Sequence, residues 1–306
     1  MKAWLVILWA GFSLCPAAWE EAVPADITRD YVEADTVLDE TPCDWREAVG
    51  SIFRPVVAGM ADAEQATLCI ASRMTELTGV YYSMDRRKAN MNALEALAEK
   101  KVSCTGQSIL LVCALRSVGI PARAVCVCTW NHVRGNHTWA EAWVHGEWRM
   151  IEFNEKSFNT PWVMESVGLL NTARPEQRVY AAAPSAHMRI PYGPTTICVE
   201  DVTERYTQLA QVWYRSTQLP PGHKRLMVDV WPRPEKALML TLETEDGRAL
   251  ATAPSPTRRD DIRQFTAFDL PEQGRYYLRL QDRPQRAPVQ ATAQPAQVVR
   301  LTTHAH

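Results

Sequence analysis

The stretch from residue 104 to residue 153 constrains the fold more than any other part of the sequence. Apolar residues recur at helical spacing from Cys104 to Val118, and Gly119 then ends the helix. Residues 122–129 are rich in valine and cysteine and predict a strand, and residues 138–153 predict a hairpin. A helix packed on one face of an antiparallel sheet is an α+β arrangement. We therefore predict an α+β core built around this helix.

Weaker patterns suggest how the rest of the chain is organised. Helical spacing predicts helices over 62–78 and 92–101, and short apolar runs predict strands over 227–230, 237–243, 265–270 and 276–280. We accordingly expect these segments: a signal peptide over 1–18, a loosely structured lead-in over 19–60, the α+β domain over 61–175, a connecting segment over 176–222 and a small β-sandwich-like domain over 223–303.

The composition limits the class of protein. The chain has 306 residues, of which 46% are hydrophobic and 22% charged, as in a globular protein rather than a disordered or fibrous one. Lys and Arg together number 33 against 35 for Asp and Glu, so the formal net charge is -2. That balance argues against a phosphate-binding surface, and we expect no nucleic-acid partner.

The N-terminus has the pattern of an export signal. Lys2 precedes an apolar run that ends at Leu14, and small residues follow up to Ala18. The run is too short for a stable membrane span, so we expect cleavage near Ala18 and an exported, periplasmic or secreted protein. A buried N-terminal helix is the alternative. A lipid-modified Cys15 is less favoured, because Leu14 is bulky where small residues are preferred.

Cys104 stands at the first position of the strongest predicted helix. The unpaired N–H groups and partial positive charge of a helix N-terminus favour a thiolate, which is a nucleophile. The neighbouring backbone N–H groups can also stabilise an oxyanion. Taken alone, the cysteine is better explained as a buried residue that packs as a small hydrophobe.

His137 stands at the start of the predicted hairpin. If His145-Gly146 forms a two-residue turn, His137 shares one sheet face with Glu152 and lies opposite Asn154. A carboxylate or amide that orients an imidazole is what a nucleophile–base–orienter triad requires. A three-residue turn would instead bring Glu155 to this face. A lone strand histidine is otherwise a structural residue.

Together these motifs resemble the transglutaminase-like superfamily. Members have a Cys that opens a helix, a Gly two positions on, an Arg-Ser-x-Gly-Ile-Pro-Ala-Arg stretch, an H-x-W-x-E strand and a G-x-W strand that ends in an acid. The matching positions are Cys104, Gly106, 116–123, His137, Trp139, Glu141, Gly146, Trp148 and Glu152. Residues 199–206 also resemble a segment that follows this core in some exported bacterial members.

The resemblance implies a papain-like core with a Cys–His–acid triad of Cys104, His137 and Glu152. Glu152 replaces the usual Asp, so Glu155 and Asn154 remain alternatives for the third residue. Ser103 replaces the usual Gly before the cysteine, which could alter access to the thiol.

The resemblance also implies the chemistry. The Cys104 thiolate would attack an amide or other acyl carbonyl of a protein, peptide or cell-wall substrate, and water or a lysine amine would complete hydrolysis or transamidation. The backbone N–H of Cys104, with Trp130 or Tyr82, would hold the oxyanion. No cofactor is implied. The alternative function is that of a catalytically inactive binding or scaffold protein.

The remaining cysteines and charges receive plainer interpretations. Cys126, Cys128, His132 and His137 are not favoured as a zinc site, because the two cysteines form a C-x-C pair. We expect Cys113, Cys126 and Cys128 to be packing residues, and we name Cys43, Cys69 and Cys198 as disulfide candidates. The charged run over 258–261 predicts a solvated loop.

Overall fold

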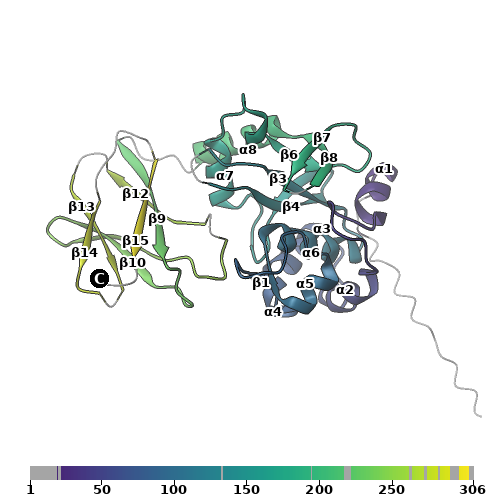
Figure 1. The fold of residues 1–306 in the computed structure, drawn as a ribbon, viewed down its shortest axis with the longest axis horizontal. Helices are drawn as coiled ribbons and strands as arrows, with labels where there is room; N and C mark the ends of the chain where they lie inside the picture. The colour runs from purple at the N-terminus through teal and green to yellow at the C-terminus, as the bar shows by residue number, and fades with distance from the viewer. Residues whose placement is uncertain are drawn as a thin grey trace, which may run out of the picture.

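The structure is a computed structural model with two lobes (Figure 1). It describes residues 19, 22–131, 134–193, 195–216, 222–261, 264–271, 274–281, 283–289 and 296–302. The predicted signal peptide over 1–18, with Cys15, lies outside the described residues, and so does His132.

Helix α6 (Cys104–Ser117) is the centre of the larger lobe and is almost entirely buried. Three helices contact it: α2 (Arg46–Phe53), α3 (Ala63–Ser72) and α5 (Ala93–Glu99). The short elements nearby are α1 (Ala25–Thr28), a π-helix (Arg29–Glu33), a 3₁₀ helix (Pro55–Val57), α4 (Met74–Thr78) and the parallel pair of β1 (Tyr81–Tyr82) and β2 (Lys101–Val102).

A six-stranded antiparallel sheet lies against these helices. Its order is β5 (Glu147–Ile151), β4 (His137–Val144), β3 (Ala122–Val127), β6 (Val179–Ala182), β8 (Thr195–Asp201) and β7 (Arg189–Tyr192). This confirms the predicted α+β, papain-like core, in which the helix that bears the cysteine packs on an antiparallel sheet.

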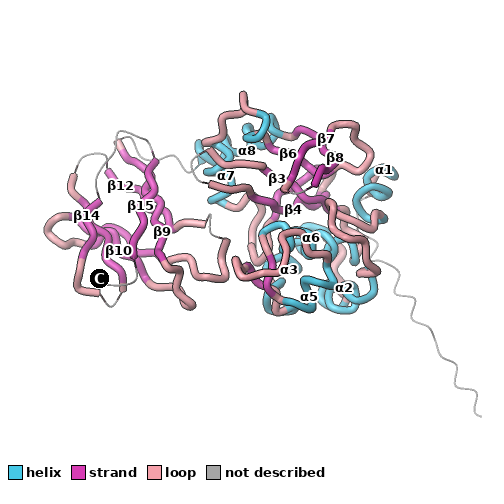
Figure 2. Tube along the Cα trace, viewed as in Figure 1, coloured by secondary structure: helices cyan, strands magenta, loops and turns pink. Residues whose placement is uncertain are grey.

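The two faces of the sheet pack against different helices (Figure 2). Small side chains on one face, such as Ala124 and Ala140, belong to the same hydrophobic cluster as the leucines of α6. On the other face, Trp139 and Met150 pack with α7 (Pro161–Gly168) and α8 (Thr203–Ser216). The central strands are therefore buried on both sides, which fixes the position of their side chains.

The smaller lobe consists of two sheets. One has the order β12 (Thr266–Pro271), β9 (His223–Trp231), β15 (Ala296–Thr302), and the other has the order β11 (Ala249–Pro254), β10 (Met239–Thr244), β13 (Tyr276–Leu280), β14 (Arg286–Val289). Side chains from both sheets, among them Val228, Leu242 and Leu278, share one hydrophobic cluster. Four of these strands, β9, β10, β12 and β13, overlap the strands predicted from the sequence.

Three predictions about segments differ from the structure. The lead-in is not loose over 46–57, because Val49 and Phe53 of α2 are fully buried in the core. The helix predicted over 62–78 is broken at Arg73 into α3 and α4. The segment over 176–222, predicted as a connection, supplies β6, β7, β8 and α8, and β6 joins it to the core sheet by pairing with β3. A 3₁₀ helix (Pro175–Gln177) lies at its start.

The seven cysteines among the described residues are free thiols. The disulfide candidates Cys43, Cys69 and Cys198 lie on a loop before α2, on α3 and on β8, and none of them is paired. Cys113 and Cys126 are buried, as the sequence predicts, whereas Cys128 is half-buried. Among the described residues, no helix combines the length and apolar character needed to cross a membrane.

Candidate active site

Cys104 is held at the N-terminus of α6 by a capped helix start. The Ser103 hydroxyl accepts a hydrogen bond from the backbone N–H of Gly106 at 3.0 Å and donates one to the carbonyl of Ala89 at 2.6 Å. Ser103 is thus the N-cap of the helix, a position that serine favours. The remaining N–H groups of the first turn surround the cysteine, which is 6% exposed.

The hairpin has the predicted two-residue turn. His145 and Gly146 both have positive φ, 53° and 76°, and Val144 pairs with Glu147 across the turn. The pairing continues to Ala140 opposite Ile151, which is the register that the two-residue turn predicts. Glu152 follows directly after this last pair, next to the strand that carries His137.

His137 and Glu152 are in direct contact. The Nε2 atom of His137 lies 2.6 Å from Oε1 of Glu152, and both residues are buried. The imidazole also stacks beside Trp130 and Trp139 and lies 4.6 Å from the ring of Trp162, measured between centroids. The aromatic side chains and the Glu152 carboxylate together fix the orientation of the imidazole ring.

The surroundings of His137 favour its charged form. Burial alone would lower the pKa of the imidazole, but the Glu152 carboxylate and hydrogen bonds with Asp261 and Cys104 raise this pKa well above its usual value. An imidazolium beside a cysteine is the partner that stabilises a thiolate.

Asn154 and Glu155, the two alternatives to Glu152 as the third residue of the triad, have other surroundings than Glu152. The Asn154 side chain forms hydrogen bonds with Thr75, one to its backbone N–H at 2.9 Å and one to its hydroxyl at 2.7 Å. Glu155 lines the same pocket as His137 and is half-buried. Burial, and then the charges of Glu152 and Asp260, raise the pKa of Glu155 to about 7. Of Glu152, Asn154 and Glu155, Glu152 is the residue that contacts His137.

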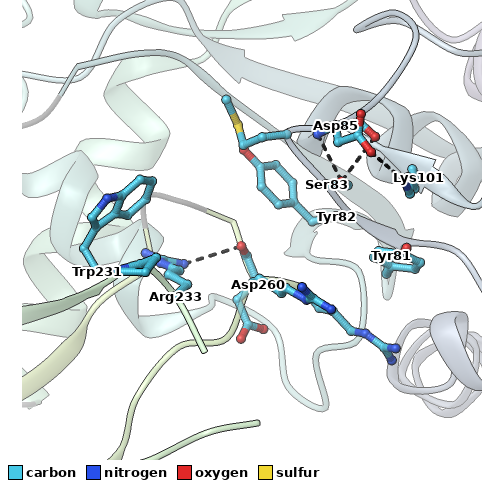
Figure 3. Close-up of a pocket in the computed structure, with 12 residues that line it drawn as sticks. Tyr81, Tyr82, Ser83, Asp85, Lys101, Trp231, Arg233 and Asp260 are labelled. Carbon is cyan, nitrogen blue, oxygen red and sulfur yellow. Dashed lines mark hydrogen bonds and ion pairs between the residues drawn. The ribbon is translucent and has the colours of Figure 1, made fainter. Parts of the chain in front are cut away.

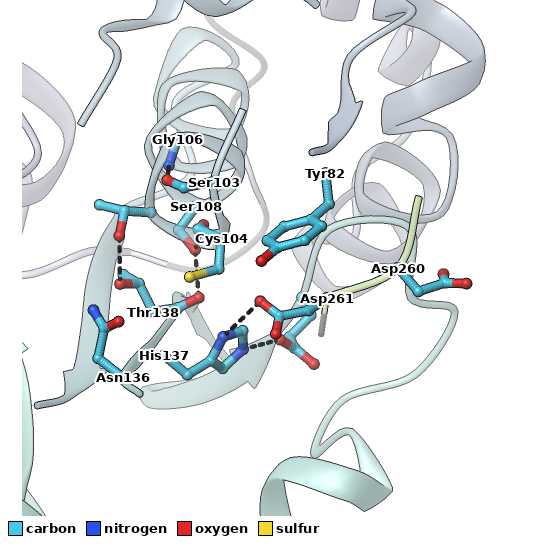
Figure 4. A network of polar contacts seen from close by, with 12 residues as sticks. Tyr82, Ser103, Cys104, Gly106, Ser108, Asn136, His137, Thr138, Asp260 and Asp261 are labelled. Carbon is cyan, nitrogen blue, oxygen red and sulfur yellow. Dashed lines mark hydrogen bonds and ion pairs between the residues drawn. The ribbon is translucent and has the colours of Figure 1, made fainter. Parts of the chain in front are cut away.

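A small pocket of ≈ 170 Å³ contains these groups. Cys104, His137, Glu152 and Glu155 line it from the larger lobe, and Asp261 lines it from the smaller lobe. Figure 4 shows His137 and Asp261 facing one another beside the N-terminus of α6, with the Tyr82 hydroxyl pointing toward them. The pocket is therefore closed by residues from two distant parts of the chain.

Asp261 corrects the prediction of a solvated loop over 258–261. It is 5% exposed, and its Oδ2 atom lies 3.5 Å from Nδ1 of His137. The guanidinium of Arg233 donates hydrogen bonds to the carbonyls of Asp261 and Gln264, both at 2.6 Å, and so holds the backbone of this loop. The sequence did not predict Asp261 as a site residue. A run of charged residues gives no local indication that one of them is buried against another lobe.

The cysteines of the C-x-C pair, which the sequence does not favour as zinc ligands, lie apart from this pocket. Cys126 is buried among Tyr180, Tyr192 and Val199, and the Cys128 thiol lies 3.7 Å from the carbonyl of Pro191. In the part of the chain that the structure describes, the one group of metal-type ligands contains Cys104, His137 and Asp261, without Cys126 or Cys128.

Glu141 of the H-x-W-x-E motif has a structural role. Its carboxylate is fully buried and accepts hydrogen bonds from Arg123 at 2.9 Å, from the Tyr206 hydroxyl at 2.7 Å and from Arg205. Arg123 also pairs with Glu200 at 2.9 Å. The segment over 199–206 therefore joins the motif through ion pairs with the buried Glu141 and Arg123.

A helix that opens with a buried cysteine, packed on a sheet that presents a histidine and a carboxylate, defines a papain-like core. Residues 52–153 match the sequence model of the transglutaminase-like superfamily. This part of the chain is a transglutaminase-like core. A search of curated proteins found no match.

Three solved structures show the range of similarity. A candidate cysteine protease from Cytophaga hutchinsonii is 17% identical, with a TM-score of 0.31, over 35% of this chain and 37% of that one. The periplasmic domain of TgpA from Pseudomonas aeruginosa, bound to ethylmercury, is 15% identical, with a TM-score of 0.31, over 37% and 45%. Red sea bream transglutaminase is 10% identical, with a TM-score of 0.41, over 83% and 60%. The chain thus spans less than two thirds of each of these proteins.

Proposed function

We propose that this chain is a transglutaminase-like cysteine enzyme that acts on amide or other acyl bonds through a thioester on Cys104. The observation that carries the proposal is that Cys104, His137 and Glu152 line one pocket, with Glu152 2.6 Å from Nε2 of His137. A nucleophile, a base and a group that orients the base are the elements of such a triad.

In the proposed reaction each residue has its own step. Because Glu152 occupies Nε2, Nδ1 is the nitrogen of His137 that is left to take the thiol proton of Cys104. The thiolate then attacks the acyl carbon, and the backbone N–H of Cys104 holds the oxyanion, with Trp130 or Tyr82 as candidate donors beside it. As the C–N bond breaks, His137 returns the proton to the leaving amine and the thioester remains.

The second half of the reaction releases the acyl group. His137 takes a proton from water or from a primary amine, which attacks the thioester carbon. The C–S bond breaks, and the sulfur leaves as a thiol after His137 returns the proton. Water yields hydrolysis and an amine yields transamidation, and both belong to the proposal.

A larger groove of ≈ 470 Å³ adjoins the thiol pocket and shares Arg259 and Asp260 with it. Aromatic residues from both lobes line this groove, among them Tyr81, Tyr82 and Trp231 (Figure 3). Aromatic side chains beside charged ones suit an extended polymer with alternating polar and apolar groups. This supports a protein, peptide or cell-wall amide as the substrate.

The proposal includes the setting and domain organisation of the enzyme. The apolar run that ends at Leu14 supports export to the periplasm or the outside of the cell. We propose that the catalytic domain is the larger lobe and that the residues over 223–303 form a β-sandwich-like domain that completes the substrate groove. A non-catalytic binding protein with the same fold is the competing function.

A panel of acyl substrates tests the proposal. Peptide amides, cell-wall peptides and a glutamine-containing protein with a fluorescent primary amine would be incubated with wild type, Cys104→Ala and Cys128→Ala. We expect turnover in wild type and Cys128→Ala, whose half-buried thiol lies outside the pocket. We expect none in Cys104→Ala. Turnover that survives in Cys104→Ala would contradict the proposal.

A further inference from the structure

Asp261 lines the thiol pocket and has no step in the proposed reaction. The Cys104 sulfur, a ring nitrogen of His137 and a carboxylate oxygen of Asp261 all lie within 4.8 Å of one another, and all three residues are buried. They come from α6, from β4 and from the loop of the smaller lobe that follows β11. Asp261 supports the charged form of His137, but a carboxylate this close to a thiolate also repels it, so the proposed reaction gives Asp261 no bond to form or break.

We propose that Cys104, His137 and Asp261 bind a divalent transition-metal ion, and that Zn²⁺ is the ion their chemistry favours. Sulfur, imidazole nitrogen and carboxylate oxygen are the three ligand types that Zn²⁺ uses in proteins. A thiolate and a carboxylate together balance its two positive charges. Three protein ligands leave one position of a tetrahedron for water, as in zinc sites that are open to solvent.

The surroundings of the three ligands fit a metal site. A histidine that binds a metal commonly donates its other ring N–H to a carboxylate. Glu152 lies 2.6 Å from Nε2 of His137, which leaves Nδ1 on the side of Asp261. The pocket thus contains both the ligands and the carboxylate that would orient the imidazole.

Asp261 is held in place from the side of the smaller lobe. Arg233 donates to its carbonyl at 2.6 Å and pairs with Asp229 of β9 at 3.3 Å, and both of these side chains are 4% exposed. Asp229 also pairs with Arg300 of β15 at 3.0 Å. A ligand on a loop that is held by these contacts is pre-organised, which lowers the entropy lost on metal binding.

The inference goes beyond the proposed function, although it uses two of the same residues. Binding releases to solvent the proton that the Cys104–His137 pair holds, so that the sulfur is a thiolate and Nδ1 has a free lone pair. Metal–sulfur, metal–nitrogen and metal–oxygen bonds form with no change of oxidation state. The sulfur lone pair is then engaged, so metal binding and attack on an acyl carbon exclude each other. Zn²⁺ would therefore hold the enzyme in a reversible inactive state with the two lobes joined through Asp261.

Cobalt spectroscopy tests the site without relying on activity. The reduced, chelator-treated full chain is titrated with Co²⁺ and read by its thiolate-to-metal charge-transfer absorption, and Zn²⁺ affinity is then measured by competition with a chromophoric chelator. We expect the charge-transfer band in wild type and its loss in Cys104→Ala. We expect Asp261→Asn to weaken Zn²⁺ binding by about 100-fold, since loss of a ligand costs at least as much as loss of a group that orients one.

Glu155→Gln is the matched control, because it removes a carboxylate from the same pocket but not from the ligand set. We expect it to weaken Zn²⁺ binding by less than about 10-fold. Unchanged circular dichroism and melting of Asp261→Asn would establish that this variant is folded. The inference is overturned if wild type shows no charge-transfer band, or if Asp261→Asn binds as tightly as Glu155→Gln. Neither result alters the acyl-substrate test, so the two proposals can fail separately.

Discussion

Oε1 of Glu152 lies 2.6 Å from Nε2 of His137, and this contact places a glutamate where the family resemblance leads us to expect an aspartate. Glu152 is the first residue after β5, so its carboxylate extends from the end of the hairpin rather than from within it. The additional methylene suits this position, because the longer side chain reaches the imidazole from just beyond the paired residues.

Glu152→Gln should slow acylation by about 10²- to 10⁴-fold, because an amide neither stabilises the imidazolium nor selects the correct tautomer of His137. The rate of thioester formation with an activated ester measures the effect. Asn154→Ala is the control, since the Asn154 side chain bonds to Thr75. If Asn154→Ala abolishes acylation while Glu152→Gln does not, the third residue is assigned wrongly.

Glu141→Gln should lower the free energy of unfolding by about 3–5 kcal/mol, because it leaves the buried Arg123 without its buried charge partner. Urea denaturation measures the change. Glu200→Gln is a matched control: its carboxylate also pairs with Arg123 at 2.9 Å, but its side chain is 58% exposed. It should cost about 1 kcal/mol or less. Equal losses in the two variants would argue against burial as the cause.

Gly106→Ala should destabilise the protein by about 1–3 kcal/mol, because a Cβ at this position would lie 2.9 Å from Cβ of Val102. Gly50→Ala in α2 is the comparison. Its Cβ would meet only the flexible end of Arg54, and alanine favours a helix over glycine by about 1 kcal/mol. The melting temperature should therefore fall for Gly106→Ala but not for Gly50→Ala. A fall of equal size in both variants would contradict this explanation.

Glu155→Gln should stabilise the protein at alkaline pH and leave it unchanged in acid. The pKa of Glu155 is raised to about 7 in the folded protein, so ionisation opposes folding as the pH rises from the unfolded value of 4.5 through 7. The gain above pH 7 should be about 1–2 kcal/mol, less than the full shift implies because solvent screens this half-exposed side chain. Melting curves at pH 4 and pH 8 test this, and an equal gain at both would rule it out.

Local patterns in the sequence predicted the parts of the site that lie close together in the chain. The helical spacing and Gly119 located α6, and the His145-Gly146 turn set the hairpin register. That register brings Glu152 to the strand of His137. These features depend on backbone periodicity and turn geometry, which nearby residues determine.

The remaining features depend on contacts between distant segments. Asp261 belongs to a charged run that is ordinary in a solvated loop, and only the docking of the smaller lobe buries it against His137. Likewise Glu200 and Arg205 gain partners only when β8 and α8 join the core. Burial and ion pairing between distant segments leave no periodic pattern in the sequence, so the sequence alone does not predict them.

The acylation site itself provides the most direct test of the central claim that His137 activates Cys104 as the nucleophile. Wild type and His137→Ala would be incubated with p-nitrophenyl acetate, quenched in acid and mapped by peptide mass spectrometry. We predict an acetyl group on Cys104 that forms together with a burst of nitrophenol, and that forms about 100-fold or more slowly in His137→Ala. Acetylation spread evenly over the cysteines, or equally fast on Cys104 in both proteins, would contradict the account.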